Sequence, residues 1–324
     1  MYQDKSMRAT VEHAKLIKIV IVGVGSVGSA TAYTLILSGI VNDLVLIDVN
    51  REKAEGESMD LNHAAPSWAS ARAGNYSDCK DADIVIITCG VSQTNGQTRM
   101  DLAAKNTDIM RDVVSNVAQN APDTILLIAT NPVDVLTYVS YEASGFPLHR
   151  VIGSGTVLDT ARFKHILGNH FKVPSNTVEA CVIGEHGDSS VAAWSLTNIK
   201  GMKLREYCEK SNQKFDEEAF QKVFEQTRDA AYDIIKRKGC TSYGIAAGLL
   251  RIVRAILANE DHVLPVSTVG AHFGIDHVAL SVPTKLNRGG AYPAGALTIN
   301  EREMELARKS AEKIKSVLDK VFIK

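Results

Sequence analysis

The sequence of 324 residues has only five cysteines, and it lacks any C-x-x-C pair of the kind used in redox and zinc motifs. The cysteines lie far apart, at Cys79, Cys89, Cys181, Cys208 and Cys240. An odd number of scattered cysteines in apolar surroundings argues against a disulfide framework. We therefore expect a reducing, cytoplasmic environment for this chain.

The chain also lacks an excess of charge of either sign. Its 36 lysines and arginines nearly balance 37 acidic residues, which gives a formal net charge of -1. Binding to nucleic acid or to an anionic membrane requires a basic surface, so this balance argues against both partners. We expect a small-molecule ligand instead.

No apolar run near the start of the chain is long enough to cross a membrane. The first such run, LIKIVIVGVG at 16–25, is interrupted by Lys18 and by glycines. A spanning helix needs about 20 consecutive apolar residues. The residues before this run are polar and do not resemble a signal peptide. We expect residues 1–15 to form an N-terminal arm, and we expect no membrane association.

The chain does contain a regular alternation of short β-branched runs with longer helical patterns between 16 and about 152. The runs LIKIVIV, DLVLIDV, DADIVIIT and TILLIAT are almost wholly apolar. Strands of this kind, separated by helices, are typical of a parallel sheet that is covered on both faces. The sequence therefore predicts an α/β fold with a Rossmann-type doubly wound domain over 16–155.

Beyond about 155 the regular alternation stops, and a mixed α+β domain is predicted over 156–324. The patterns favour helices at 157–168 and 214–237, a strand near 178–183, and β-rich stretches near 263–282. A final helix is predicted because Asn300 can cap it. Apolar residues recur along it at helical spacing, at Leu306, Ile314, Leu318 and Val321.

The glycine-rich turn GVGSVG at 23–28 follows the first apolar strand and opens a helix. Gly23 permits a tight turn, Gly25 lets the backbone approach a pyrophosphate, and Gly28 lets the helix pack closely on the strand. Asp48 ends the next strand, where a carboxylate can accept hydrogen bonds from a ribose. A carboxylate there also repels a 2′-phosphate. The pattern therefore predicts a dinucleotide site for NAD rather than NADP.

Further residues lie at or near the carboxyl ends of the expected strands, the edge where open α/β sheets bind ligands. We predict additional cofactor contacts from Val27, Lys53, Tyr76, Gly90, Val91, Ala129, Asn131 and Ser154. Asn131 is the most distinctive of these, because it follows a buried-looking strand directly, in ATNP.

Several longer motifs occur in one order along the chain. They are GVGSVG with Asp48, GQTRMDL at 96–102, ATNPVDVLTY at 129–138, VIGSGTVLDTARF at 151–163, GEHGDSS at 184–190 and KGCTSYGIA at 238–246. This series resembles the lactate/malate dehydrogenase family, and within it the L-lactate dehydrogenases. The resemblance runs from about residue 16 to the C-terminus, and it implies reversible hydride transfer between NADH and a 2-keto acid such as pyruvate.

The resemblance implies a role for each residue of a catalytic group. His186 matches the family's acid/base, because an imidazole titrates near neutrality. Asp159 matches the carboxylate that hydrogen-bonds the other ring nitrogen. Arg162 lies on the same helical face as Asp159, and it matches the guanidinium that binds the substrate carboxylate through two parallel hydrogen bonds.

Arg99 lies in a polar, glycine-containing stretch between a strand and a helix. In the family this loop closes over the substrate and brings its arginine against the reacting carbonyl. Asn131 matches the amide that binds near the same oxygen. The remaining histidines have neither HExxH spacing nor nearby cysteines, so we predict no metal site.

Two residues bear on the choice of substrate. In malate-specific relatives an arginine stands where this chain has Gln93. A neutral Gln93, with Thr241 shaping the far wall, suits the methyl group of pyruvate better than a second carboxylate. Asn95 and Gln97 depart from the usual proline and glutamate of this loop. These departures leave room for larger substrates such as 2-ketobutyrate or a branched keto acid.

Two alternatives stay open at this point. The first is another enzyme, a malate or broader L-2-hydroxy acid dehydrogenase, which Gln93 disfavours. The second is a non-catalytic NAD-binding or structural protein on the same fold, since fold does not determine function. A non-catalytic protein would be expected to lack at least one catalytic residue. This sequence retains all four, which are His186, Asp159, Arg162 and Arg99.

The resemblance also implies a homotetramer. Many bacterial members of the family are activated by fructose 1,6-bisphosphate, which they hold with an arginine and a histidine at the positions of Lys164 and Glu179 here. Lysine can still attract a phosphate, but glutamate repels one. We therefore predict that this effector does not activate the protein.

Overall fold

The computed structural model describes residues 16–91 and 99–322, and for residues 99–102 only the backbone. Its first half contains six parallel strands: β1 (Lys18–Val22), β2 (Asp43–Ile47), β3 (Ser70–Ala73), β4 (Ile84–Ile87), β5 (Ile125–Ile128) and β6 (Val151–Gly153). They lie side by side in the order β6-β5-β4-β1-β2-β3. The order reverses between β1 and β4, which is the point at which open α/β sheets bind their ligands.

Three antiparallel strands from the second half extend the same sheet beyond β6. They are β12 (His262–His272), β13 (Ile275–Asn287) and β14 (Gly290–Pro293). β12 joins β6 through the pairs Ser267 with Gly153 and Thr268 with Ile152. The β-rich stretches that the sequence places in a second domain therefore complete a nine-stranded sheet that begins in the first half.

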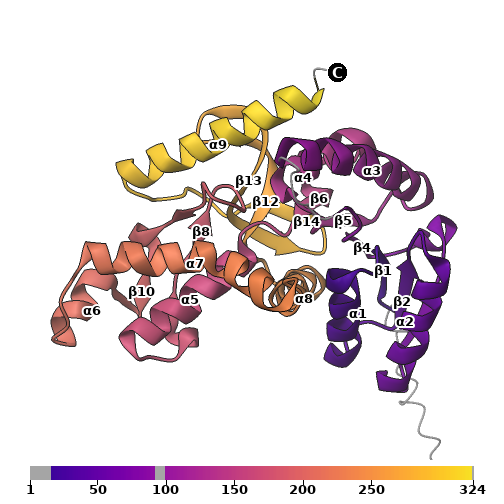
Figure 1. Ribbon diagram of the computed structural model, residues 1–324, viewed down its shortest axis with the longest axis horizontal. Helices are drawn as coiled ribbons and strands as arrows, with labels where there is room; N and C mark the ends of the chain where they lie inside the picture. Colours follow the sequence, from indigo (N-terminus) through magenta and orange to yellow (C-terminus); the bar gives the residue numbers. More distant parts are fainter. Residues whose placement is uncertain (1–15, 92–98, 323–324) are drawn as a thin grey trace, which may run out of the picture.

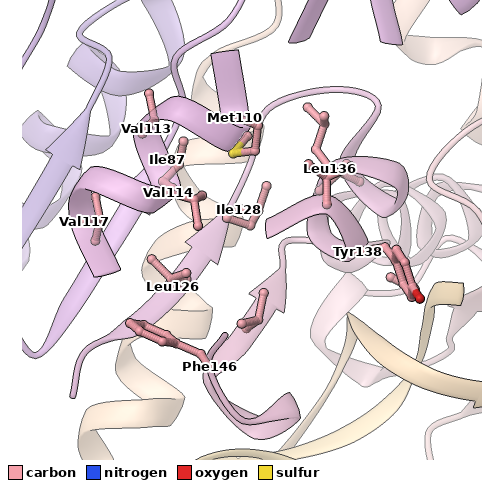
Figure 2. Packing of buried hydrophobic residues seen from close by; sticks show 14 of the residues in the cluster. Ile87, Met110, Val113, Val114, Val117, Leu126, Ile128, Leu136, Tyr138 and Phe146 are labelled. Carbon is pink, nitrogen blue, oxygen red and sulfur yellow. The ribbon is translucent and has the colours of Figure 1, made fainter. Parts of the chain in front are cut away.

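Helices cover both faces of this sheet (Figure 1). One face packs against α3 (Arg99–Asn120), α4 (Val133–Ser144) and α9 (Glu301–Phe322), and the other against α1 (Ser26–Ser38), α2 (Arg51–Ala64) and α8 (Tyr243–Ala258). Successive strand residues point to opposite faces, so Ile19 and Val20 of β1 belong to different cores. Figure 2 shows Met110 and Val114 of α3 packed near Ile128 of β5.

A separate core lies in the second half, at the left of Figure 1. It joins α5 (Val157–Phe171), α6 (Leu204–Lys210) and α7 (Glu217–Lys238) with the short strands β7 (Val178–Glu179), β8 (Val182–Ile183), β9 (Val191–Ala192), β10 (Asn198–Ile199) and β11 (Met202–Lys203). Its centre is aromatic, because the ring of Phe163 meets those of Trp194 and Phe224 edge to face. Edge-to-face contacts of this kind add to the stabilisation from burial alone.

The fold agrees with most of the elements expected from the sequence and corrects several details. The strand expected near 178–183 is split into β7 and β8, while β3 and β6 were not predicted. Asn300 accepts a hydrogen bond from the backbone of Glu303, which confirms its capping role. Leu306 is 44% exposed, and the neighbouring Ala307 faces the core instead. Among the described residues, no helix has the length and apolar character needed to cross a bilayer.

Candidate active site

The glycine-rich turn lies between β1 and α1, at the point where the strand order reverses. Gly23 has a φ of +97°, and a Cβ there would come within 2.5 Å of the backbone nitrogen of Cys89. A Cβ on Gly28 would lie 1.9 Å from the carbonyl oxygen of Gly23. A Cβ on Gly25 would meet no atom within 4 Å. Two glycines thus allow close packing, and the third leaves open space before the N-terminus of α1.

The Asp48 carboxylate is held beside this turn. Its Oδ2 accepts a hydrogen bond of 2.7 Å from the backbone of Val24, and its Oδ1 accepts one of 2.9 Å from the backbone of Asn50. A carboxylate can accept about four hydrogen bonds, so acceptor positions are left for ribose hydroxyls. Open space at a helix N-terminus next to a fixed carboxylate fits the pyrophosphate and ribose of NAD.

The other residues predicted to contact the cofactor surround the same edge of the sheet. Gly90 and Val91 follow β4, Ala129 and Asn131 follow β5, and Ser154 follows β6. Val27 and Lys53 lie on the first turns of α1 and α2, and Tyr76 begins a short 3-10 helix after β3. Tyr76 also packs against the core between the sheet and helices α3, α4 and α9, and burial raises the pKa of its hydroxyl to about 12. Their contacts with NAD remain predictions.

His186 follows β8 in a loop that is anchored to the large sheet. Gly184 forms two backbone hydrogen bonds with Ser281 of β13, at 2.9 and 3.1 Å. The His186 ring meets Asp159, in the first turn of α5, with Nδ1 and Oδ2 separated by 2.5 Å. Because Nδ1 is hydrogen-bonded to the Asp159 carboxylate, Nε2 is the ring nitrogen left for a ligand.

Arg162 lies one turn along α5 from Asp159. Its Nη1 is 3.4 Å from Oδ1 of Asp159, and its side chain is only 13% exposed. The spacing expected from the sequence therefore brings the two side chains together. The single long contact leaves the other donors of the guanidinium fork available.

A cavity of about 340 Å³ joins these groups. Asn131, Arg162 and His186 line it together with apolar residues of α4, α7 and α9, among them Val135, Ala231 and Ile314. Few polar groups converging in a largely apolar pocket are typical of a small-molecule site. Asp159 lines the cavity too, so the structure brings together four of the residues that the sequence analysis selected.

The charges in this site support one another. Burial alone would disfavour an ionised His186, but the Asp159 and Asp134 carboxylates outweigh it and raise the pKa of the imidazole to about 9. Burial also opposes ionisation of Asp159, yet the His186 and Arg162 charges lower the pKa of that carboxyl. The site therefore favours an imidazolium beside a carboxylate at neutral pH.

Some predicted site residues are not placed in this cavity. Gln93 lies outside the described residues, and so does the side chain of Arg99, whose backbone begins α3. Thr241 is half-buried just before α8, and it is not among the described residues that line the cavity. The roles predicted for these three residues remain predictions.

The structure also reveals two buried residues that the sequence analysis missed. Asp134, in the first turn of α4, accepts a hydrogen bond of 2.7 Å from the backbone N–H of His186. Asn106 of α3 bonds the backbones of Val91 and Asn131. Both belong to ordinary helical sequence, so no local signal distinguishes them. Among the side chains that the structure describes, at 16–91 and 103–322, no three metal-ligating groups gather at one place.

Comparison with known proteins gives a consistent result. Residues 17–153 match the family model for the lactate/malate dehydrogenase NAD binding domain, and residues 156–324 match that for the lactate/malate dehydrogenase alpha/beta C-terminal domain. The chain is 48% identical to a probable L-lactate dehydrogenase of Schizosaccharomyces pombe over 323 residues, covering 99% of this chain and 97% of the relative. It is 46% identical to an L-lactate dehydrogenase of Acetivibrio thermocellus, covering 93% and 96% respectively.

Solved structures show the same similarity in three dimensions. The minor L-lactate dehydrogenase of Enterococcus mundtii, in its ligand-bound form, superposes with a TM-score of 0.90 at 42% identity. The match covers 95% of this chain and 99% of that one.

Proposed function

The chain belongs to the lactate/malate dehydrogenase family, and we propose that it is an NAD-dependent L-lactate dehydrogenase in which His186 carries the proton. The net reaction converts pyruvate, NADH and one proton to L-lactate and NAD⁺. The observation that carries the proposal is the His186–Asp159 pair at 2.5 Å, which faces the cavity that Arg162 and Asn131 also line.

His186 acts as general acid when pyruvate is reduced. Its Nδ1 holds a proton toward Asp159, so the proton on Nε2 is the one donated to the carbonyl oxygen. In lactate oxidation a neutral Nε2 takes the proton back from the hydroxyl. Asp159 keeps the ring oriented and stabilises the imidazolium that this exchange requires.

Arg162 binds the substrate carboxylate. Only Nη1 of the Arg162 guanidinium contacts Asp159, at 3.4 Å, so its other donors are left for the substrate. The planar guanidinium can pair with a carboxylate through two parallel hydrogen bonds. Asn131 lines the same cavity, and we propose that its amide binds near the reacting oxygen.

NADH, when bound, supplies the hydride to the carbonyl carbon. We assign its pyrophosphate to the open space at Gly25 and its adenosine ribose to Asp48. Open space and a fixed carboxylate at the N-terminus of α1 support this assignment.

A monocarboxylate substrate suits the remaining charges. Among the side chains that the structure describes, two further cations line the cavity. Each has a carboxylate within ion-pair distance: Lys313 with Glu185 at 2.7 Å, and Arg228 with Asp229 at 3.2 Å. A second substrate carboxylate would have to compete for a cation that is already paired. This favours pyruvate over oxaloacetate, which remains the alternative substrate within the family.

The test is a comparison of kcat/KM for pyruvate, oxaloacetate and 2-ketoisocaproate. Turnover is measured as the loss of NADH absorbance. We expect pyruvate to be preferred. Preference for oxaloacetate would identify a malate dehydrogenase. No turnover with any keto acid, despite NADH binding, would favour a non-catalytic NAD-binding protein.

We also propose a homotetramer in the cytoplasm, with a role in glycolysis and pyruvate fermentation. The support is the family membership together with the absence of paired cysteines in the sequence. Light scattering coupled to size exclusion would measure the assembly, and a mass of one or two subunits would contradict the tetramer.

A further inference from the structure

Asp134 is a buried carboxylate that the proposed reaction does not use. It lies in the first turn of α4 and is 2% exposed. Its Oδ2 accepts the hydrogen bond from the His186 backbone at 2.7 Å, and its Oδ1 accepts one from the Ser267 hydroxyl at 2.6 Å. His186 is therefore held twice, at its ring by Asp159 and at its backbone by Asp134.

Placing a carboxylate in this position is costly. Within the described residues, no lysine or arginine lies within ion-pair distance of Asp134. Burying an ionised carboxylate without a paired cation costs several kcal/mol even after relaxation. Two hydrogen bonds and the N-terminus of α4 offset part of that cost. The carboxylate is thus retained at a cost in burial, and its two hydrogen-bond partners indicate what it holds.

Three segments that form the site meet at Asp134. The chain just before it, Asn131 and Pro132, lines the cavity, as does Val135 just after it. Ser267 belongs to β12, and His186 belongs to the loop after β8. Their separation along the chain reaches 133 residues between Asp134 and Ser267. One carboxylate thus connects the wall that carries Asn131 to the loop that carries His186.

We propose that Asp134 is a positioning residue, which keeps the His186 imidazole aligned with Asn131 and with the cavity through its hydrogen bonds to the His186 backbone and to Ser267. The inference rests on the proposed function of His186. A displacement of about 1 Å in a reacting group can reduce turnover on the order of a hundredfold.

Asp134 acts on His186 by charge as well as by hydrogen bonding. The charged groups that act on the imidazole are Asp159, Asp134 and Arg162, and Glu185 acts in turn on Asp134. Burial raises the pKa of Asp134 to about 6, so it is mostly ionised above neutral pH. Its negative charge then favours the imidazolium. Removing that charge alone lowers the pKa of His186.

Two substitutions separate the hydrogen bond from the charge. In Asp134→Asn the amide oxygen can still accept from the His186 backbone, and the Ser267 hydroxyl can turn to accept from the amide. We expect kcat at neutral pH to fall only a few-fold. We also expect the alkaline limit of pyruvate reduction to move down by on the order of one pH unit.

Asp134→Ala removes both interactions. We expect kcat to fall on the order of tenfold to a hundredfold below that of the Asn variant, while the Kd for NADH stays unchanged. Ser267→Ala keeps the carboxylate but loses one of its two partners. It should give an intermediate loss of kcat, and it keeps the inference testable if the Asp134→Ala protein does not fold.

Glu303→Gln is the matched control. Glu303 is also a buried carboxylate in the first turn of a helix, and it accepts backbone hydrogen bonds from Ser195 and Asn300. It is not among the described residues that line the cavity. Its variant should lose thermal stability without any change in the pH profile.

The outcomes distinguish this inference from the proposed function. A folded Asp134→Ala protein with unchanged kcat and pH profile would overturn the positioning role, provided that His186→Asn is inactive. An active His186→Asn protein would overturn the proposed function itself. An Asn variant as impaired as the Ala variant, with no shift of the pH limit, would also contradict the inference.

Discussion

The side-chain amide of Asn106 donates a hydrogen bond of 2.8 Å to the backbone carbonyl of Asn131. The same amide group accepts from the backbone N–H of Val91, also at 2.8 Å. Asn106 itself is 1% exposed. A single side chain of α3 therefore ties together the chain segments that follow β4 and β5.

Replacing Asn106 with alanine should destabilise the protein and weaken pyruvate binding. The substitution removes the hydrogen-bond partner of one backbone N–H and one backbone C=O, at about 0.5–1.5 kcal/mol for each bond. Chemical denaturation would measure the loss, and the KM for pyruvate should rise. Asn116→Ala on the same helix is the control, because that amide bonds only within the helix. Equal losses in the two variants would contradict the prediction.

Replacing His186 with asparagine should remove turnover and leave NADH affinity nearly intact. The residues assigned to the cofactor lie on the edge of the parallel sheet, whereas the proton donor lies in the second half. General acid–base catalysis typically contributes on the order of 10²–10⁴ in rate. Steady-state kinetics and NADH fluorescence titration would measure the two effects separately. Wild-type kcat in this variant would rule out the assigned role.

Pyruvate reduction should lose activity as the pH rises through about 9. In the proposed mechanism, pyruvate reduction uses a protonated His186. Burial lowers the pKa of this imidazole, but the Asp159 carboxylate outweighs burial and raises it to about 9. The imidazolium is thus present at neutral pH and is lost above the folded pKa. Lactate oxidation needs the neutral ring and should rise over the same range. Asp159→Asn should shift both limits to lower pH, and unchanged limits would argue against the pairing.

Replacing Gln93 with arginine should raise kcat/KM for oxaloacetate and lower it for pyruvate. Gln93 lies outside the described residues, so this prediction rests on the sequence. An added cation would pair with a second carboxylate, but it would remain unpaired opposite a methyl group. The ratio of the two kcat/KM values is the measurement. A ratio that does not move would mean that Gln93 does not contact the substrate.

Fructose 1,6-bisphosphate should not change the saturation curve for pyruvate. Lys164 is half-buried, and burial lowers the pKa of its amino group, while the Glu179 carboxylate acts in the opposite direction. Glu179 is exposed on β7, where it accepts a hydrogen bond from Asn198. A carboxylate at this position repels phosphate. Kinetics with and without millimolar effector test the prediction, and a several-fold drop in the KM for pyruvate would refute it.

The sequence predicted those parts of the fold that have a local signature. Strands β1, β2, β4 and β5 were found because each contains a continuous apolar run. Strand β3 was missed because its sequence, SARA, has no such run, and it becomes a strand only by pairing with β2. Strand β6 has only three residues, too few for a periodic pattern.

The site residues also divide into those with a local sequence signature and those that only the tertiary fold reveals. His186, Asp159 and Arg162 were found because each stands in a motif, and the structure brings them to one cavity. Asp134 was missed because an aspartate in the first turn of a helix is ordinary. Its partner His186 is 52 residues away, and only the tertiary fold shows that the two meet.

The pairing of β12 with β6 bears on how genes of this kind can be divided or recombined. A fragment that ended near residue 155 would leave β6 as an unprotected edge, an apolar strand that could template pairing between molecules. In the intact chain, β12 of the second half covers this edge of the cofactor-binding half. An exchange of halves between relatives would succeed only where the incoming β12 presents a small residue opposite Gly153, as Ser267 does here.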